Sequence, residues 1–193
     1  MKAIKQGLNS LKIAVFCIIL PLVVSARAPE PSFPETIELG SSESALNKLG
    51  EYRYVYRVFF KLYDAVLYAA PGASPSDVLS ATTRYRLQFR YLRTIDKSII
   101  LESSAKMLER NLQRAELAQI SERVERLNEA YQTVNEGDHS SLTYQPGIGT
   151  TLTINGVPVI TIEGEDFARL YYRIWLGAHP ISESLRENLL GDR

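Results

Sequence analysis

Residues 84–91, RYRLQFRY, carry the clearest structural pattern in the chain, because apolar and polar side chains alternate along the whole stretch. The apolar positions are Tyr85, Leu87, Phe89 and Tyr91. Successive side chains of a β-strand point to opposite faces, so this period of two predicts a half-buried strand with aromatic groups inside. The intervening arginines are interpreted first as a solvated face.

Strand-forming residues also dominate the region before this segment. Residues 52–60 and 62–69 are dense in β-branched and aromatic side chains, which predicts two strands joined by a turn or bulge. Residues 36–39 are expected to form a short first strand, and residues 44–49 a brief helix or a loop. The PGASP stretch at 71–75 marks a break in regular structure.

The region after residue 137 contains a strong hairpin signal. Residues 150–154 and 157–163 flank Asn155-Gly156, and both of these residues tolerate the positive φ angles of a type I′ turn. Another strand is expected at 141–144. These three segments extend the sheet predicted from the first half of the chain.

Helical periodicity appears in the middle and at the end of the chain. Apolar residues three and four apart run from Asp96 to Leu112 and again from Glu116 to Val134, which predicts two amphipathic helices. Further helices are expected over 165–176 and 180–190. This order predicts an α+β fold, an open-faced β-sandwich in which a large antiparallel sheet has helices layered on one face.

The N-terminus has the three-part layout of a secretory signal peptide. Three lysines precede an apolar run over 13–24, and small residues follow it at the cleavage position near Ala26. We therefore expect a signal peptide over 1–26, a proline-rich tether over 27–35 and one domain over 36–193. An uncleaved anchor is the alternative, but the apolar run is shorter than the roughly 20 residues of a membrane span.

Export would place the protein in the periplasm or outside the cell, with no stable membrane span after leader cleavage. The chain has 22 basic and 22 acidic residues, so it lacks the basic excess of a nucleic-acid-binding protein. Its single Cys lies in the leader, and its two histidines have no neighbours at metal-ligand spacing. We expect no metal and no cofactor; protein partners and oligomeric state are left open.

Arginine and tyrosine on the predicted strands are the strongest candidates for chemistry. An inward Arg beside a Tyr hydroxyl binds a carboxylate or an enolate-like oxygen in an apolar pocket. Arg53, Arg57 and Tyr63 are the ligand-binding candidates, with Arg53 and Arg57 as alternatives for the cation. The competing interpretation is that the tyrosines pack in the core and the arginines are solvated.

Several short motifs occur in order along the chain: Gly50-Glu51-Tyr52-Arg53, Phe60-Lys61-Leu62-Tyr63-Asp64-Ala65-Val66-Leu67-Tyr68, Tyr91-Leu92-Arg93-Thr94-Ile95, Gly137-Asp138, Thr153-Ile154-Asn155-Gly156, Asp166-Phe167, Ile174-Trp175-Leu176-Gly177, Leu185-Arg186 and Leu189-Leu190-Gly191. Together they resemble bacterial chalcone isomerase-like proteins over about residue 36 to the C-terminus. The resemblance implies an open-faced β-sandwich with a cleft between sheet and helices.

What the resemblance implies for activity depends on Tyr63. Plant isomerases close a chalcone to a flavanone with a strand Arg, a strand Thr and a helix Tyr, Lys and Asn; here Tyr63 occupies the Thr position. Lys106 and Asn111 lie in the helix region without a matching motif. Family members without catalysis bind fatty acids through an Arg and a Tyr, a role that suits Tyr63.

Three functions follow as hypotheses. The first is an exported, non-catalytic protein that binds a small amphipathic acid such as a fatty acid in the cleft between sheet and helices. The second is an intramolecular lyase with chalcone isomerase-type cyclisation, so enzymatic activity is left uncertain. The third is a structural or interaction protein of the envelope without a small ligand, favoured by a cleft closed by aromatic side chains.

Overall fold

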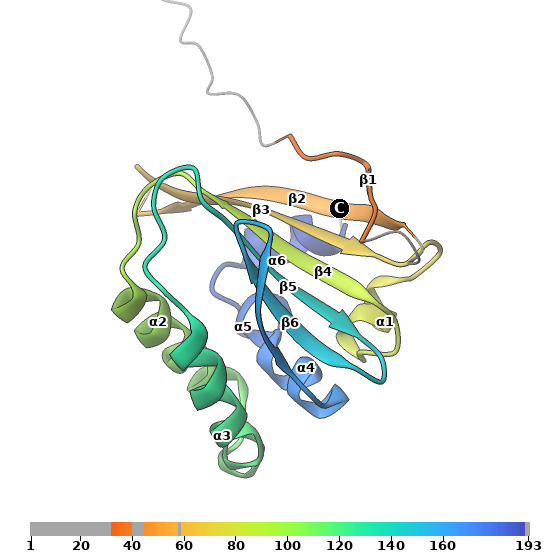
Figure 1. The fold of residues 1–193 in the computed structure, drawn as a ribbon, viewed down its shortest axis with the longest axis vertical. Coiled ribbons are helices and arrows are strands. Elements are labelled where there is room, and N and C mark those ends of the chain that lie inside the picture. The colour runs from red at the N-terminus through yellow and green to blue at the C-terminus, as the bar shows by residue number, and fades with distance from the viewer. Residues whose placement is uncertain (1–31, 40–44, 58, 192–193) are drawn as a thin grey trace, which may run out of the picture.

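A computed structural model describes residues 32–39, 45–57 and 59–191. In this part of the chain seven strands form one sheet in sequence order, and every neighbouring pair is antiparallel (Figure 1). The strands are β1 (Thr36–Ile37), β2 (Leu46–Tyr56), β3 (Phe60–Ala69), β4 (Tyr85–Tyr91), β5 (His139–Gln145), β6 (Gly149–Ile154) and β7 (Val157–Ile162). The helices are α1 (Pro75–Leu79), α2 (Lys97–Asn111), α3 (Arg114–Ala130), α4 (Glu165–Tyr171), α5 (Arg173–Leu176) and α6 (Glu183–Leu190).

The main core lies between the sheet and the helices, which confirms the α+β fold with helices on one face. Strand β4 decides which side is buried: its apolar positions all belong to this core, as the alternation predicted. Helix α6 packs on β2 and β3, α4 on β6, and α3 on β7. The β6–β7 hairpin turns at Asn155-Gly156, both with positive φ, as expected for a type I′ turn.

The other face of the sheet carries a short N-terminal strap. Phe33 is buried there beside Leu46, Val66 and Tyr68, and the Tyr68 hydroxyl donates to the Pro34 carbonyl at 2.9 Å. Residues 33–35 were expected in the proline-rich tether, whereas the structure packs them against the sheet. The expected signal peptide over 1–26 and the expected tether up to residue 31 lie outside the described residues.

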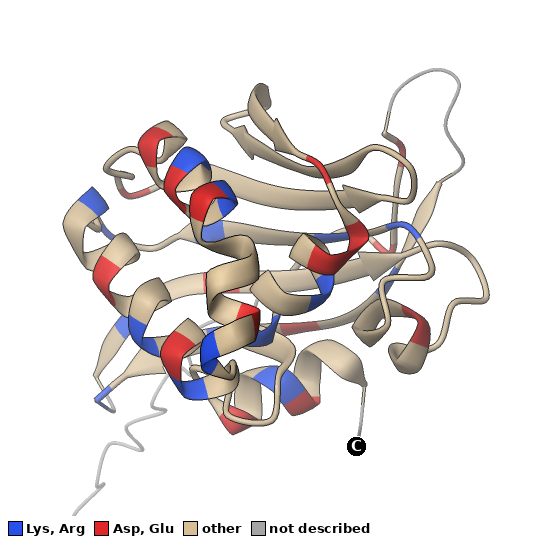
Figure 2. Cartoon of the chain, turned by 90° about the horizontal axis from the view of Figure 1, so that it is seen from below, with Lys and Arg blue, Asp and Glu red and all other residues tan. Residues whose placement is uncertain are grey.

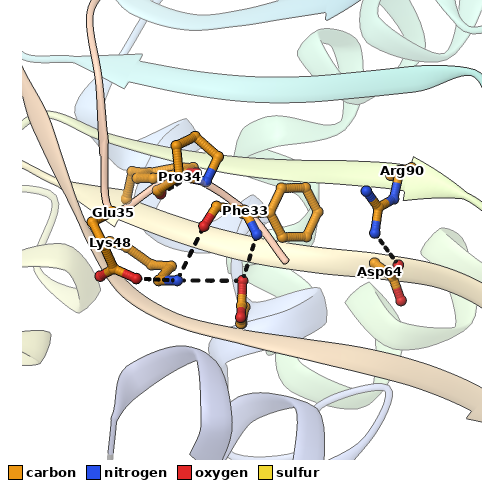
Figure 3. Close-up of polar contacts among 8 residues, drawn as sticks. Phe33, Pro34, Glu35, Lys48, Asp64 and Arg90 are labelled. Carbon is orange, nitrogen blue, oxygen red and sulfur yellow. Dashed lines mark hydrogen bonds and ion pairs between the residues drawn. The ribbon is translucent and has the colours of Figure 1, made fainter. Parts of the chain in front are cut away.

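Lys48 anchors this strap from β2. Its Nζ lies 2.7 Å from a Glu35 carboxylate oxygen, 3.5 Å from one of Glu51, and donates to the Phe33 carbonyl at 3.2 Å (Figure 3). Phe33 in turn lies over Arg90, with the guanidinium carbon 5.1 Å from the ring centroid. The strap therefore covers part of the outer face beside β3 and β4.

Several expected boundaries differ from the structure. The expectation of a helix or loop over 44–49 is wrong from Leu46 onward, because the buried Leu46 and the residues after it pair with both β1 and β3. At the end of the expected break over 71–75 the short helix α1 begins, with a Ser74–Asp77 capping box and Pro75 in its first turn. The single helix expected over 165–176 divides at Tyr172 into α4 and α5.

The described residues contain neither a candidate membrane-spanning helix nor a cluster of metal-binding side chains. No helix there has the length and apolarity needed to cross a membrane. No group of His, Cys, Asp and Glu in the same residues is arranged to hold a metal ion.

Candidate functional site

Tyr63 lies on β3 and faces the helices. Its ring centroid is 5.1 Å from that of Tyr54, 5.2 Å from Phe89 and 6.3 Å from Tyr91. Burial raises the pKa of Tyr63 well above its ordinary value, and its hydroxyl has no hydrogen-bond partner among the described residues. A buried hydroxyl of this kind is costly unless something accepts or donates to it.

Aromatic rings continue from Tyr63 toward the helices. Phe89 and Trp175 have centroids 5.4 Å apart, and Trp175 lies 6.5 Å from Tyr172. Tyr172 in turn packs edge-on against Tyr85 of β4 at 4.8 Å. The layer between sheet and helices is thus filled with aromatic side chains where the family resemblance implied a cleft.

Arg53 lies on the opposite face of the sheet from Tyr63. In the β2–β3 register Arg53 is opposite Asp64 and Tyr54 is opposite Tyr63, so the two pairs point to different faces. The Arg53 guanidinium donates to both Asp64 oxygens, at 2.6 and 3.0 Å, and Arg90 donates to Oδ2 at 2.7 Å (Figure 3 draws the Arg90 contact). The outer arginine row is therefore not simply solvated, because Arg90 is bound to a buried carboxylate.

Arg57 lies at the turn between β2 and β3. It is exposed, has a φ of 47°, and its Nε donates to the Tyr56 hydroxyl at 3.1 Å. The structure thus brings neither Arg53 nor Arg57 beside Tyr63. The assignment of these three residues to a ligand stays a prediction. It gains no support from the structure, because the three side chains do not line a common pocket.

A pocket of about 340 Å³ opens in the helical layer instead. Three arginines line it: Arg169 and Arg173, four residues apart on α4 and α5, and Arg186 on α6. The pocket wall also contains Val78, Leu79 and Leu176, together with Tyr172, whose hydroxyl is buried without a good hydrogen bond. The pocket therefore combines cations with apolar surface.

Arg173 and Arg186 are positioned by hydrogen bonds within the protein. Arg173 donates to a Glu116 carboxylate oxygen at 3.2 Å, and Arg186 Nε donates to the Leu176 carbonyl at 3.2 Å. Asn111, at the end of α2, bonds both the N–H and the carbonyl of His179 and so fixes the loop beside the pocket. Arg186 belongs to the Leu185-Arg186 motif of the family resemblance, but no motif pointed to Arg169 and Arg173, although their i, i+4 spacing was visible in the sequence.

A second hollow of about 330 Å³ lies on the uncovered face of the sheet. Arg86 is its cation, and its Nε already donates to the Thr143 hydroxyl at 2.7 Å. The wall also carries the carboxylate of Glu38. One cation beside one anion makes this hollow a poorer acid site than the three-arginine pocket.

Most of the chain matches a known protein family. The sequence model described as chalcone isomerase-like matches residues 27–191. The chain belongs to the chalcone isomerase-like family. Among solved structures, this chalcone isomerase-like protein is similar to a fatty-acid binding protein of Arabidopsis thaliana. The identity is 15% and the TM-score 0.61, over 83% of this chain and 91% of that one. No curated protein sequence matches.

Two of the motifs that resembled the chalcone isomerase-like family have structural roles here. A Cβ at Gly50 would overlap the backbone carbonyl oxygen of Asn188, so glycine lets α6 lie directly on β2. Asp166 receives two hydrogen bonds from Arg123, at 2.8 and 2.6 Å, and one from Gln119 at 2.8 Å. The hydrogen bond from Arg123 is the main reason that the pKa of Asp166 lies well below its ordinary value. These contacts join α3 to the start of α4.

Proposed function

We propose that this chalcone isomerase-like protein is a non-catalytic binding protein for a small amphipathic acid such as a fatty acid. The observation that carries the proposal is the pocket in which Arg169, Arg173 and Arg186 converge beside apolar residues. A guanidinium group presents several N–H donors to a carboxylate, and hydrogen bonds to charged groups contribute about 1.5–3 kcal/mol each.

The size of the pocket limits the ligand. About 340 Å³ lies at the lower end of the range of roughly 300–1,000 Å³ that is usual for small-molecule sites. We place the carboxylate at the arginines and the first carbons of the tail against Val78 and Leu176. A longer tail follows the aromatic side chains that connect Tyr172 through Trp175 and Phe89 to Tyr63, and it enters by displacing rings.

Tyr63 offers a second position for the acid head. Its buried hydroxyl makes no hydrogen bond of good geometry among the described residues, which supports a hydrogen bond to a carboxyl group there. Because aromatic rings surround Tyr63 and the neighbouring Lys61 is exposed, an acid bound there would be protonated or only weakly held. The arginine pocket is therefore the preferred position, and variants distinguish the two.

The binding test uses the purified protein and its single tryptophan, Trp175, which neighbours Tyr172. Extraction with organic solvent followed by mass spectrometry identifies any acid that co-purifies, and titration with dodecanoate is followed by Trp175 fluorescence. Replacing Arg169 or Arg173 by Gln is expected to weaken binding about 10- to 100-fold. Arg114→Gln, an exposed arginine outside the pocket, is the matched control.

The outcomes separate the alternatives. A loss of affinity in Tyr63→Phe, with none in the arginine variants, moves the acid head to the Tyr63 position. If no acid is extracted and dodecanoate does not bind, the proposal fails. Chalcone cyclisation above the uncatalysed rate would favour the intramolecular lyase instead.

An envelope structural or interaction protein without a small ligand is the second candidate. The aromatic packing around Tyr63, which closes the layer beneath the helices, favours it. Export remains part of the proposal in both cases. Mass determination of the protein purified from its own cells tests it, since cleavage near Ala26 removes a segment of known mass.

A further inference from the structure

Three large apolar side chains are exposed together at the β2–β3 turn. The exposed fractions are 46% for Tyr56, 85% for Phe59 and 47% for Phe60. Elsewhere the large exposed apolar residues include Ile148 and Val157 at the turns of β5–β6 and β6–β7. An aromatic cluster on a projecting turn leaves apolar surface in water unless it meets a partner.

Basic side chains surround these rings. The guanidinium carbon of Arg57 lies 5.3 Å from the Tyr56 ring centroid, and that of Arg93, from the loop after β4, lies 5.2 Å from the Phe60 centroid. Lys61 follows on β3, and the described residues from Tyr56 to Lys61 include no acid. We call Tyr56, Arg57, Phe59, Phe60, Lys61 and Arg93 the aromatic–cationic tip.

Acidic residues occur near the tip on α2, where Glu102 pairs with Lys106 and Lys106 interacts electrostatically with Tyr56, and on the loop between α3 and β5. Its backbone bonds to that of Tyr91, and it carries Glu136 and Asp138. Asp138 is engaged locally, since it accepts from the backbone N–H of Asn135 at 2.7 Å and from the Asn155 amide at 3.0 Å. These carboxylates reduce the net charge of this end of the molecule but do not neutralise the tip itself.

The surface of the helices differs from the tip in its distribution of charge. Lys, Arg, Asp and Glu are interspersed there (Figure 2), as on an ordinary solvated surface. The tip lies at the upper left of Figure 1, at the opposite end of the sheet from α1, which contributes to the arginine pocket. A role of the tip is therefore separate from ligand binding and does not rest on the proposed function.

We propose that the aromatic–cationic tip docks the protein on the surface of an anionic lipid bilayer. Tyr favours the boundary between headgroups and acyl chains, where its apolar ring and its hydroxyl are both accommodated, and the Phe rings bury apolar surface just below it. Arg57, Lys61 and Arg93 then lie at the level of the anionic headgroups and are attracted to them. Charge complementarity with the tip is what favours an anionic bilayer over a neutral one.

Co-sedimentation with vesicles tests this proposal. The full chain is mixed with vesicles of phosphatidylcholine and phosphatidylglycerol at three to one, or of phosphatidylcholine alone, at physiological salt. We expect at least tenfold stronger binding to the anionic vesicles. Phe59→Ser should reduce this binding about tenfold, and Arg57→Gln about fivefold, the effect of one basic residue near such a surface.

Matched controls isolate the tip. Ile148→Ser removes an apolar residue that is 50% exposed on another turn, and Arg114→Gln removes an exposed arginine at the start of α3. All variants share the same N-terminus, so its own contribution to vesicle binding is common to them. Phe59 is 85% exposed, so its replacement should leave the melting temperature unchanged.

Three results would overturn the proposal. One is wild-type protein that stays in the supernatant with anionic vesicles. Another is equal binding by Phe59→Ser and Ile148→Ser. The third is a dimer in sedimentation velocity that Phe59→Ser dissociates, because the tip would then be a contact between two copies of this chain.

Discussion

Replacing Asp64 by Asn should destabilise the protein by about 2–4 kcal/mol. The Asp64 side chain is fully buried and accepts three hydrogen bonds, two from Arg53 and one from Arg90. Removing one partner of a buried ion pair typically costs about 3–5 kcal/mol. The two arginine side chains keep 17% and 34% exposure, so partial hydration lowers the expected cost.

Urea denaturation of wild type and variant measures this cost. Asn keeps the shape of the side chain and one acceptor oxygen, so the midpoint should fall while the dependence on urea stays the same. Glu102→Gln is the matched control, because Glu102 forms a solvent-exposed pair with Lys106, and exposed pairs of this kind contribute little to stability. Equal midpoints for the two variants would refute the reasoning.

The pH dependence of the stability difference between wild type and Asp64→Asn provides a second check. Burial alone would raise the pKa of Asp64, but hydrogen bonds and charge from Arg53 and Arg90 outweigh it and lower the pKa. A lowered pKa in the folded state stabilises the protein above the unfolded value, and this contribution is lost as the pH falls. The difference in free energy of unfolding between wild type and Asp64→Asn should be constant from about pH 7 to 5 and decrease below about pH 4.

Two further substitutions test contacts that hold helices in place. Gly50→Ala should cost more than about 2 kcal/mol in the free energy of unfolding, because the new methyl group meets the backbone of α6 at Asn188, which cannot rotate away; an unchanged melting temperature would contradict this. Asp166→Asn should lower the free energy of unfolding by about 1–2 kcal/mol, because it weakens the hydrogen bond with Arg123 that is the main cause of the lowered pKa of Asp166. The variant should also lose less stability than wild type on acidification. Urea titrations at pH 7 and pH 3 that give the same difference in unfolding free energy between wild type and variant would argue against it.

The sequence predicted the parts of the fold that depend on local periodicity. The alternation over 84–91 located β4 and its buried face, and Asn155-Gly156 located the last hairpin. It missed α1, because five residues are too short for a helical period and Ser74-Pro75 reads equally well as a turn. It also missed the start of β2 at Leu46, whose burial depends on partners distant in sequence.

The site was harder to predict because sheet parity and helix packing are both non-local. An Arg and a Tyr on neighbouring strands face each other only when their register matches, and here the register pairs Arg53 with Asp64 rather than with Tyr63. The pocket arginines come from three helices whose relative positions depend on how each packs on the sheet. Only the spacing of Arg169 and Arg173 was visible in the sequence.

The direction of the strand arginines limits where an acid can bind. Arg53, Arg86 and Arg90 all point to the outer face, where Asp64 and Thr143 already engage them. Apart from Lys61 at the exposed start of β3, the opposite positions of β3 and β4 carry the aromatic and aliphatic groups of the core. A carboxylate on that side therefore depends on cations from the helices, and α4, α5 and α6 provide them at one pocket. Replacing an outer arginine such as Arg53 should accordingly change stability, whereas replacing Arg169 should change affinity.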